Sequence, residues 1–143
     1  MFGAEIAATV VYQTLAGDSV IQGAVGDSLA GIEIVPQNMS LPAGLFHPTS
    51  SNYGGPIQGG ASSETLGYTV KFICEGISTD PIWDAAERQM DLFDGKVFEV
   101  EVRGERYAVS FTAQGESIPT TVYEGGVYYR LLGTAYDVQI TRG

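Results

Sequence analysis

A strict alternation of side chains between Thr65 and Glu75 places the strongest constraint on how this chain can fold. The apolar members of the alternation are Leu66, Tyr68, Val70, Phe72 and Cys74. Successive side chains of a β-strand point to opposite faces, so this segment predicts a strand with one core face and one mostly polar face. The core face of a sheet built on such a strand has to be covered by other elements of the chain.

Two segments have the apolar spacing of helices that could provide this cover. The first runs from Ala4 to Ala16, and the second from Asp80, the expected N-cap, to Phe93. The apolar stripe of the second helix is Ile82, Ala85, Ala86, Gln89, Met90 and Phe93. On the same helix, Asp84 and Arg88 have the spacing of an i,i+4 ion pair.

The remaining patterns predict further β structure and short connections. The expected strands or extended segments are 32–35, 45–47, 65–75, 98–103, 107–113 and 127–140. Asp18 is expected to cap a short turn, a type II′ turn is expected at Gly104-Glu105, and Gly133 is expected to mark a bulge or bend. The order of elements predicts one α+β domain over residues 1–143, with an antiparallel (mixed) β-sheet and two α-helices packed on one face.

Residues 48–63 differ from the rest of the chain in composition. They contain two Gly-Gly pairs and two prolines but no charged residue. A loop of this length inside a small domain is usually functional or disordered, so we expect a flexible insertion. Tyr53 and Ile57 are its sizeable apolar residues, and we expect them to contact another subunit.

The charge of the chain limits its partners. Seven Lys and Arg residues face 17 Asp and Glu residues, which gives a net charge of −10. High-affinity nucleic-acid binding requires basic side chains, so that function is disfavoured. The chain has no basic segment before an apolar stretch and no apolar run long enough to cross a membrane, so we expect a protein that folds in the cytoplasm without a membrane partner.

Few residues offer chemistry. The single cysteine, Cys74, and the single histidine, His47, form neither a disulfide framework nor a Cys/His zinc set, so no metal or cofactor is expected. Glu99 and Glu101 share a strand face, but no pattern distinguishes a catalytic acid and base from a solvated surface. We therefore expect no enzyme, while an enzyme that uses Glu99, Glu101 and His47, or a small-molecule-binding domain, is the alternative from a different class.

Tyrosines are concentrated near the C-terminus, where Tyr123 and Tyr128 flank a Glu-Gly-Gly sequence. Such rings could stack on nucleic-acid bases, but no basic groove accompanies them. Packing against another subunit is the favoured interpretation, so Tyr123 and Tyr128 join Tyr53 and Ile57 as possible subunit contacts.

The order of these elements resembles that of the tail terminator proteins of long-tailed phages, which are also called tail completion or tail-to-head joining proteins. In the N-terminal half, the resemblance rests on a first helix ended by Gly17-Asp18, a turn ending at Gly31, the strand 32–35, an extended segment that follows Leu41-Pro42, and a long strand before a capped helix. In the C-terminal half, it rests on the hairpin that begins with the strand 98–103, the turn at Glu124-Gly125-Gly126 and the strand 127–140. The chain departs from the family's usual pattern in the insertion at 48–63.

The resemblance implies a ring of six α+β subunits at the head-proximal end of the tail tube of a virion, assembled in the host cytoplasm. Such a ring would end tube polymerisation and contact both the tail tube protein and the head-tail connector protein. DNA would pass through it as non-specific cargo. A tail tube subunit or a connector stopper protein is the nearest alternative.

Overall fold

The computed structural model describes residues 2–56, 62–115 and 120–143, with the backbone alone for residues 51–56 and 62. Within these residues the chain forms three helices and seven strands. The elements are α1 (Gly3–Ala16), α2 (Ser19–Val25), β1 (Leu29–Ala30), β2 (Ala43–Pro56), β3 (Ser62–Glu75), α3 (Asp80–Phe93), β4 (Val97–Val102), β5 (Glu105–Ala113), β6 (Thr120–Glu124) and β7 (Val127–Arg142).

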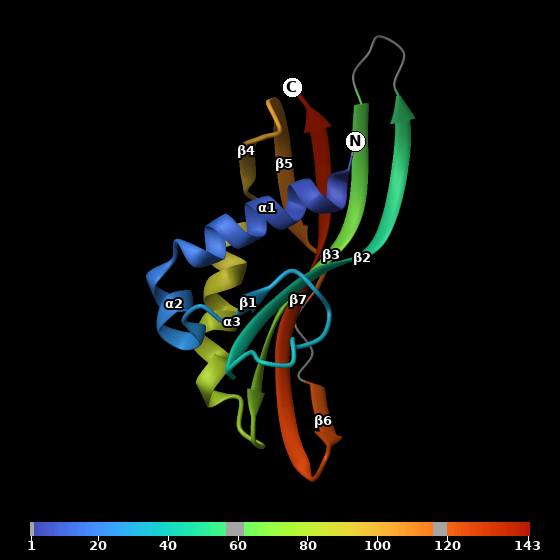
Figure 1. The fold of residues 1–143 in the computed structure, drawn as a ribbon. Helices are drawn as coiled ribbons and strands as arrows, with labels where there is room; N and C mark the ends of the chain where they lie inside the picture. Colours follow the sequence, from blue (N-terminus) through green and yellow to red (C-terminus); the bar gives the residue numbers. More distant parts are fainter. Residues whose placement is uncertain (1, 57–61, 116–119) are drawn as a thin grey trace.

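The strands form one mixed sheet around the long strand β7. One side of β7 pairs antiparallel with β3, from Thr141 opposite Ser63 to Tyr129 opposite Glu75. Its other side pairs with β5 near the C-terminus and with β6 near the start of the strand. The sheet order is β1-β2-β3-β7-β5-β4, with β1 parallel to β2. The molecule is elongated, and the β2–β3 and β6–β7 hairpins project at opposite ends (Figure 1).

The predicted α+β architecture is confirmed, because the helices lie together on one side of the sheet (Figure 1). A third helix was not expected: the short turn predicted after Asp18 is the helix α2, and the Asp18 carboxylate accepts a hydrogen bond from the Ile21 N–H at 3.2 Å. The N-cap of α3 is Thr79 rather than Asp80, which is the first residue of that helix.

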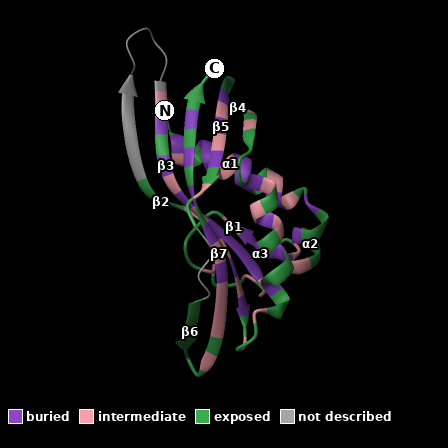
Figure 2. Cartoon of the chain, turned by 180° about the vertical axis from the view of Figure 1, so that it is seen from behind, coloured by how far each residue is buried: buried purple, intermediate pink, exposed green. Residues whose placement is uncertain are grey.

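The core lies between the helices and one face of the sheet. Figure 2 shows the buried positions concentrated where β3, β5 and β7 pass beneath α1 and α3. Phe93 in the last turn of α3 is the centre of an aromatic cluster, with ring centroids 5.0 Å from Phe111 of β5 and 6.1 Å from Tyr136 of β7. Gln89, one turn earlier, is fully buried and accepts a hydrogen bond from the Tyr136 hydroxyl, whereas the buried hydroxyl of Tyr68 has no hydrogen-bond partner among the described residues.

The flexible loop expected over residues 48–63 is a β-hairpin wherever the structure describes it. β2 continues to Pro56 and β3 begins at Ser62, with register shifts near Pro48 and between Tyr53 and Pro56. The composition was misleading because it does not reveal backbone pairing with β3, and the two irregularities accommodate residues that fit a regular ladder poorly. Ile57 lies outside the described residues, and the expected mobility of this region stays a prediction.

The strand expected at 32–35 is absent, since the structure has bends there and the strand is β1, at Leu29–Ala30. The chain leaves the sheet after two residues of pairing with Gly44 and Leu45. Ile34 is 70% exposed, so the alternation in 32–35 does not correspond to one buried face.

The first C-terminal hairpin is confirmed, but its turn lies one residue earlier than expected. Arg103 and Gly104 both have positive φ, 52° and 81°, as a type I′ turn requires. Gly133 does not mark a bulge, because the β3–β7 register is continuous through it. A Cβ at Gly133 would lie 2.6 Å from the Cβ of Lys71, so glycine permits a close approach of the two strands.

Part of the segment between the expected strands 107–113 and 127–140 is also a strand. Residues 120–124 form β6, which a turn at Gly125 and Gly126, with φ of 61° and 80°, connects to β7. Every residue of β6 is exposed, so the strand lacks the buried alternation from which strands are predicted.

Arg88 pairs across the fold rather than along its own helix. Its Nε and Nη2 donate to the Oδ1 of Asp18 at 3.0 and 2.9 Å, whereas the expected partner, Asp84, is exposed. Asp18 is 9% exposed and also caps α2, so one carboxylate links α2 to α3. The hydrogen bonds from Arg88 hold the pKa of the Asp18 carboxyl below its ordinary value of 3.8.

We predict that Asp18→Ala lowers the free energy of unfolding at pH 7 by about 1 to 3 kcal/mol, because it removes a cap and leaves Arg88 without its partner. Asp84→Ala is the matched control and should change it by less than about 0.5 kcal/mol. The stabilisation from a lowered pKa is complete above the pKa of the unfolded chain and is lost as the pH falls through the lower pKa of the folded state, so the difference between wild type and Asp18→Ala should shrink as the pH falls below 3.8. Chemical denaturation at several pH values measures this, and equal effects of the two substitutions would contradict it.

Candidate subunit interface

The residues considered for catalysis lie far apart. Glu99 and Glu101 are exposed on β4, and His47 lies on β2, with β3, β7 and β5 between the two strands. Four strand spacings separate them by roughly 19 Å across the sheet. The nearest carboxylate to His47 in an ion pair is Glu33, 3.9 Å from its Nδ1. These side chains therefore cannot act on one small substrate together.

Cys74 is a buried thiol rather than a nucleophile. It is 1% exposed, and its Sγ donates to the carbonyl oxygen of Ser78 at 3.3 Å. Burial raises the pKa of the Cys74 thiol, which keeps it protonated. Among the residues that the structure describes, no group of His, Cys, Asp and Glu side chains could hold a metal ion, and no helix is long and apolar enough to span a membrane.

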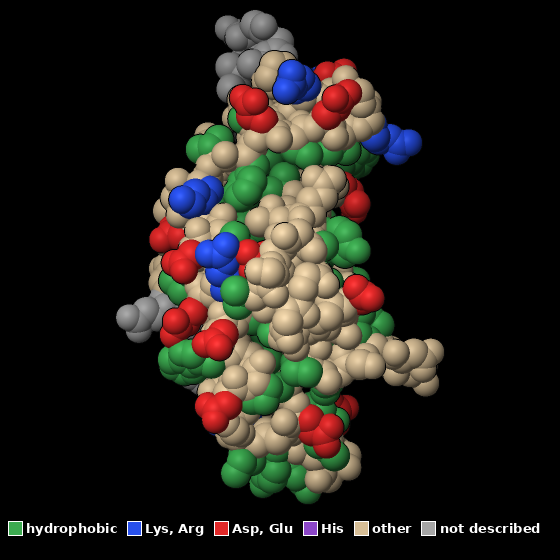
Figure 3. Space-filling model, turned by 90° about the vertical axis from the view of Figure 1, so that its left-hand side faces the viewer, with side chains coloured by type: hydrophobic (Ala, Val, Ile, Leu, Met, Phe, Trp, Pro, Cys, Tyr) green, Lys and Arg blue, Asp and Glu red, His purple; other side chains and the backbone are tan. Residues whose placement is uncertain are grey.

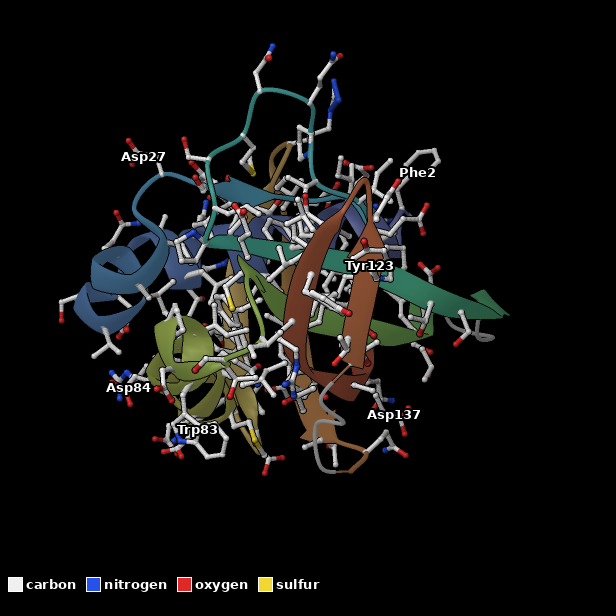
Figure 4. The ribbon with its side chains drawn as sticks, turned by 90° about the horizontal axis from the view of Figure 1, so that it is seen from below. Phe2, Asp27, Trp83, Asp84, Tyr123 and Asp137 are labelled. Carbon is white, nitrogen blue, oxygen red and sulfur yellow. The ribbon has the colours of Figure 1, made fainter. Side chains whose placement is uncertain are left out.

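Large apolar side chains are exposed at several places on the surface. They are Phe2, Tyr12, Val20, Ile32, Ile34, Ile77, Trp83, Val97, Val122, Tyr123 and Tyr128. Figure 4 views the molecule from the end that carries β6, and it shows Tyr123 on the β6–β7 hairpin, apart from Trp83 on α3. Single exposed apolar residues are common on proteins, so only those that gather into one surface indicate an interface.

One such surface is the β6–β7 hairpin, residues 120–131, which we call the hairpin tip. Tyr123 and Tyr128 face each other across the strands, with ring centroids 4.6 Å apart and 62% and 48% of their surfaces exposed. Ile77, 71% exposed, lies in the neighbouring turn, where its carbonyl accepts a hydrogen bond from Arg130 at 2.9 Å. The hairpin tip therefore presents aromatic surface on a strand pair that is fixed to the body.

A groove lies on the sheet face opposite the helices, next to the hairpin tip. Its volume is about 640 Å³. The segment 33–41 contributes Glu33, Ile34, Val35, Pro36, Gln37, Met39 and Leu41, and the strands contribute Leu45, Lys71, Ile73, Val122, Glu124, Tyr129 and Leu131. The lining is mostly apolar. The strands β6 and β7 therefore carry apolar surface on both faces, with the tyrosine pair on one face and the groove on the other.

The structure brings together two of the four residues expected at a subunit contact. Tyr123 and Tyr128 form the exposed pair described above. Tyr53 is a β2 residue opposite Glu64 in the register, and its side chain is not described; Ile57 lies outside the described residues. The groove was not expected from the sequence, although Ile34, two residues before Pro36, could have suggested an exposed apolar segment.

Charge is unevenly distributed over the side that carries the helices. Figure 3 shows acidic side chains along this whole side, whereas the basic ones lie in its upper half. In α3 the exposed acidic residues are Asp80, Asp84, Glu87 and Asp91. This side of the molecule is therefore unsuited to holding a phosphate backbone.

No protein-family model matches the chain, and no curated protein matches it. Among solved structures, a chain from an assembly described as "Virion of native gene transfer agent (GTA) particle" has a TM-score of 0.69 and 17% sequence identity to this chain. The match covers 99% of this chain and 96% of that chain. The likeness shows a shared fold that extends from α1 to β7.

Proposed function

We propose that this chain is a structural protein of a phage-like virion, and more narrowly a tail terminator. In this proposal it forms a ring of about six subunits at the head-proximal end of the tail tube, ends tube polymerisation and joins the tail to the head connector. The observation that carries the proposal is the end-to-end likeness of fold to a chain of the gene transfer agent virion. Most of the element order on which the resemblance to tail terminators rests is present and supports the narrower role, although the strand expected at 32–35 is replaced by β1 at Leu29–Ala30.

The surface of the molecule supports a role in assembly. The hairpin tip and the groove beside it expose tyrosine, isoleucine and valine side chains that a free monomer would leave in water. The two hairpins project beyond the body at opposite ends, where they can reach neighbouring subunits (Figure 1). When each subunit uses two different surfaces to contact its two neighbours, the subunits form a closed ring if the rotation from one subunit to the next adds up to a full turn.

The charge supports passage of DNA without binding. Each chain carries −10, so a ring of six would carry about −60, and a channel within it would not retain a polyanion. DNA is then cargo rather than a ligand, and the tail tube and head-tail connector proteins are the partners. The chain acts without catalysis, cofactor or membrane in this proposal, and it resides in the virion after assembly in the host cytoplasm.

We expect the purified protein to form single closed rings of about six copies of the 15.2 kDa chain. Mass photometry over a range of concentrations measures the number of copies, and negative-stain electron microscopy shows their arrangement. Long tubes would indicate a tail tube subunit instead. Monomers in solution together with no ring in the assembled particle would contradict the proposal.

The double substitution Glu99→Ala, Glu101→Ala should leave ring formation unchanged and alter the free energy of unfolding by less than about 0.5 kcal/mol, because these exposed side chains have no chemical role. Phe98→Ala, on the same strand, is the comparison. Its ring lies 5.8 Å from that of Phe93, so we expect a loss of about 2 to 4 kcal/mol. Loss of particle assembly by the glutamate variant with its fold intact would revive the alternative of an active site.

A further inference from the structure

The strand β6 has one free edge. It pairs with β7 on one side, and no other strand of residues 2–56, 62–115 and 120–143 pairs with it. We propose that this edge, together with the adjoining groove, binds an extended segment of a different virion protein, which joins the sheet as an additional strand. The inference rests on the proposed function, because it takes the partner to be a neighbouring virion subunit.

The turn of the hairpin decides which backbone groups face outward. Glu124 and Val127 flank a two-residue turn, and residues in that position exchange backbone hydrogen bonds with each other. Bonding alternates along an antiparallel ladder, so the N–H and C=O groups of Tyr123 and Thr121 point away from β7. Strands seldom leave such groups unprotected at an edge, and here they are available to a partner strand.

Both faces of β6 can contact the side chains of an added strand. On the helix side the Tyr123 ring stands beside that of Tyr128, and on the other side Val122 lines the groove. The opposite rim of the groove carries Ile34, which is 70% exposed. A strand added to β6 would direct alternate side chains toward the tyrosine pair and toward the groove. Recognition of extended peptides at sheet edges combines backbone pairing with such alternate side-chain sites.

Two other free edges of this chain, those of β4 and β2, fit the site poorly. A second copy's β4 would bring Glu99 and Glu101 toward Glu33 and Glu124 of the groove, and like charges in that position repel. The opposite face of β4 carries Phe98, which is already packed in its own core.

The edge of β2 is equally unsuitable. From Thr49 to Pro56 its only large apolar residue is Tyr53, so it cannot supply apolar side chains at alternate positions. The apolar lining of the groove and the carboxylates at Glu33 and Glu124 favour a segment of a different protein as the occupant. Its expected chemistry is apolar residues at every second position on the groove side, with Lys or Arg near Glu33 and Glu124.

Crosslinking identifies the occupant directly. Particles are assembled with this chain carrying the photoreactive residue p-benzoylphenylalanine in place of Val122, and irradiation should join it to a different virion protein. Hydrogen exchange should also be at least about tenfold slower at Thr121 and Tyr123 in the particle than in the isolated protein. A crosslink only to a second copy, or equal exchange, would overturn the inference and leave the proposed function standing. Absence of the chain from the particle would contradict both.

Matched variants test the edge and the groove separately. Thr121→Pro removes an outward N–H and should lower incorporation into particles at least about tenfold, whereas Thr121→Val keeps the N–H and should not. Ile34→Ser should also lower incorporation, whereas Ile32→Ser, at a residue that does not line the groove, should not. Circular dichroism shows whether Thr121→Pro folds. If it does not fold, the comparison of Ile34→Ser with Ile32→Ser tests the proposed binding site. Equal incorporation of these two variants would count against the groove as a binding site.

Discussion

The ladder between β3 and β7 is the interaction on which the rest of this structure depends. It runs from the β6–β7 end of the molecule to the β2–β3 end without a register shift, and Gly133 allows the strands to approach closely where a side chain would collide with Lys71. Both strands turn the same face toward the helices, so a one-residue slip would expose the whole core face of β3. The helices cover the middle of this ladder, and each end continues into a hairpin with exposed surface (Figure 2).

This arrangement separates folding from assembly. The core under α1 and α3 is mostly apolar, and Gln89 and Tyr136 form a hydrogen-bonded pair within it. The two ends consist of strands held mainly by backbone hydrogen bonds, and among the described residues each end has a strand edge that no other strand pairs with. Such edges are favourable places for contacts with another chain, which supports the proposed role in assembly.

The sequence was sufficient for elements in which local pattern and tertiary burial agree. β3 and α3 were predicted closely because alternation and helical spacing coincide with the buried face. β6 was missed because none of its residues is buried, and β2 was cut short because composition does not reveal backbone pairing with a distant strand. The sequence predicted Asp84, one helical turn away, as the partner of Arg88. The observed partner is Asp18, which is distant in the sequence and is brought near only by the fold. At the candidate interface, Tyr123 and Tyr128 could be anticipated because a Gly-Gly turn places them opposite each other, whereas the groove depends on the path of residues 33–41 over the sheet.

We propose that this chain ends the growth of a tail tube and joins the tube to a head. The decisive experiment deletes its gene and measures the length of every tube in electron micrographs of the particles. We expect heads without tails together with unattached tubes of variable and excessive length, and restoration of uniform attached tails when the chain is supplied. Tails of normal length attached to heads in the absence of the chain would contradict it.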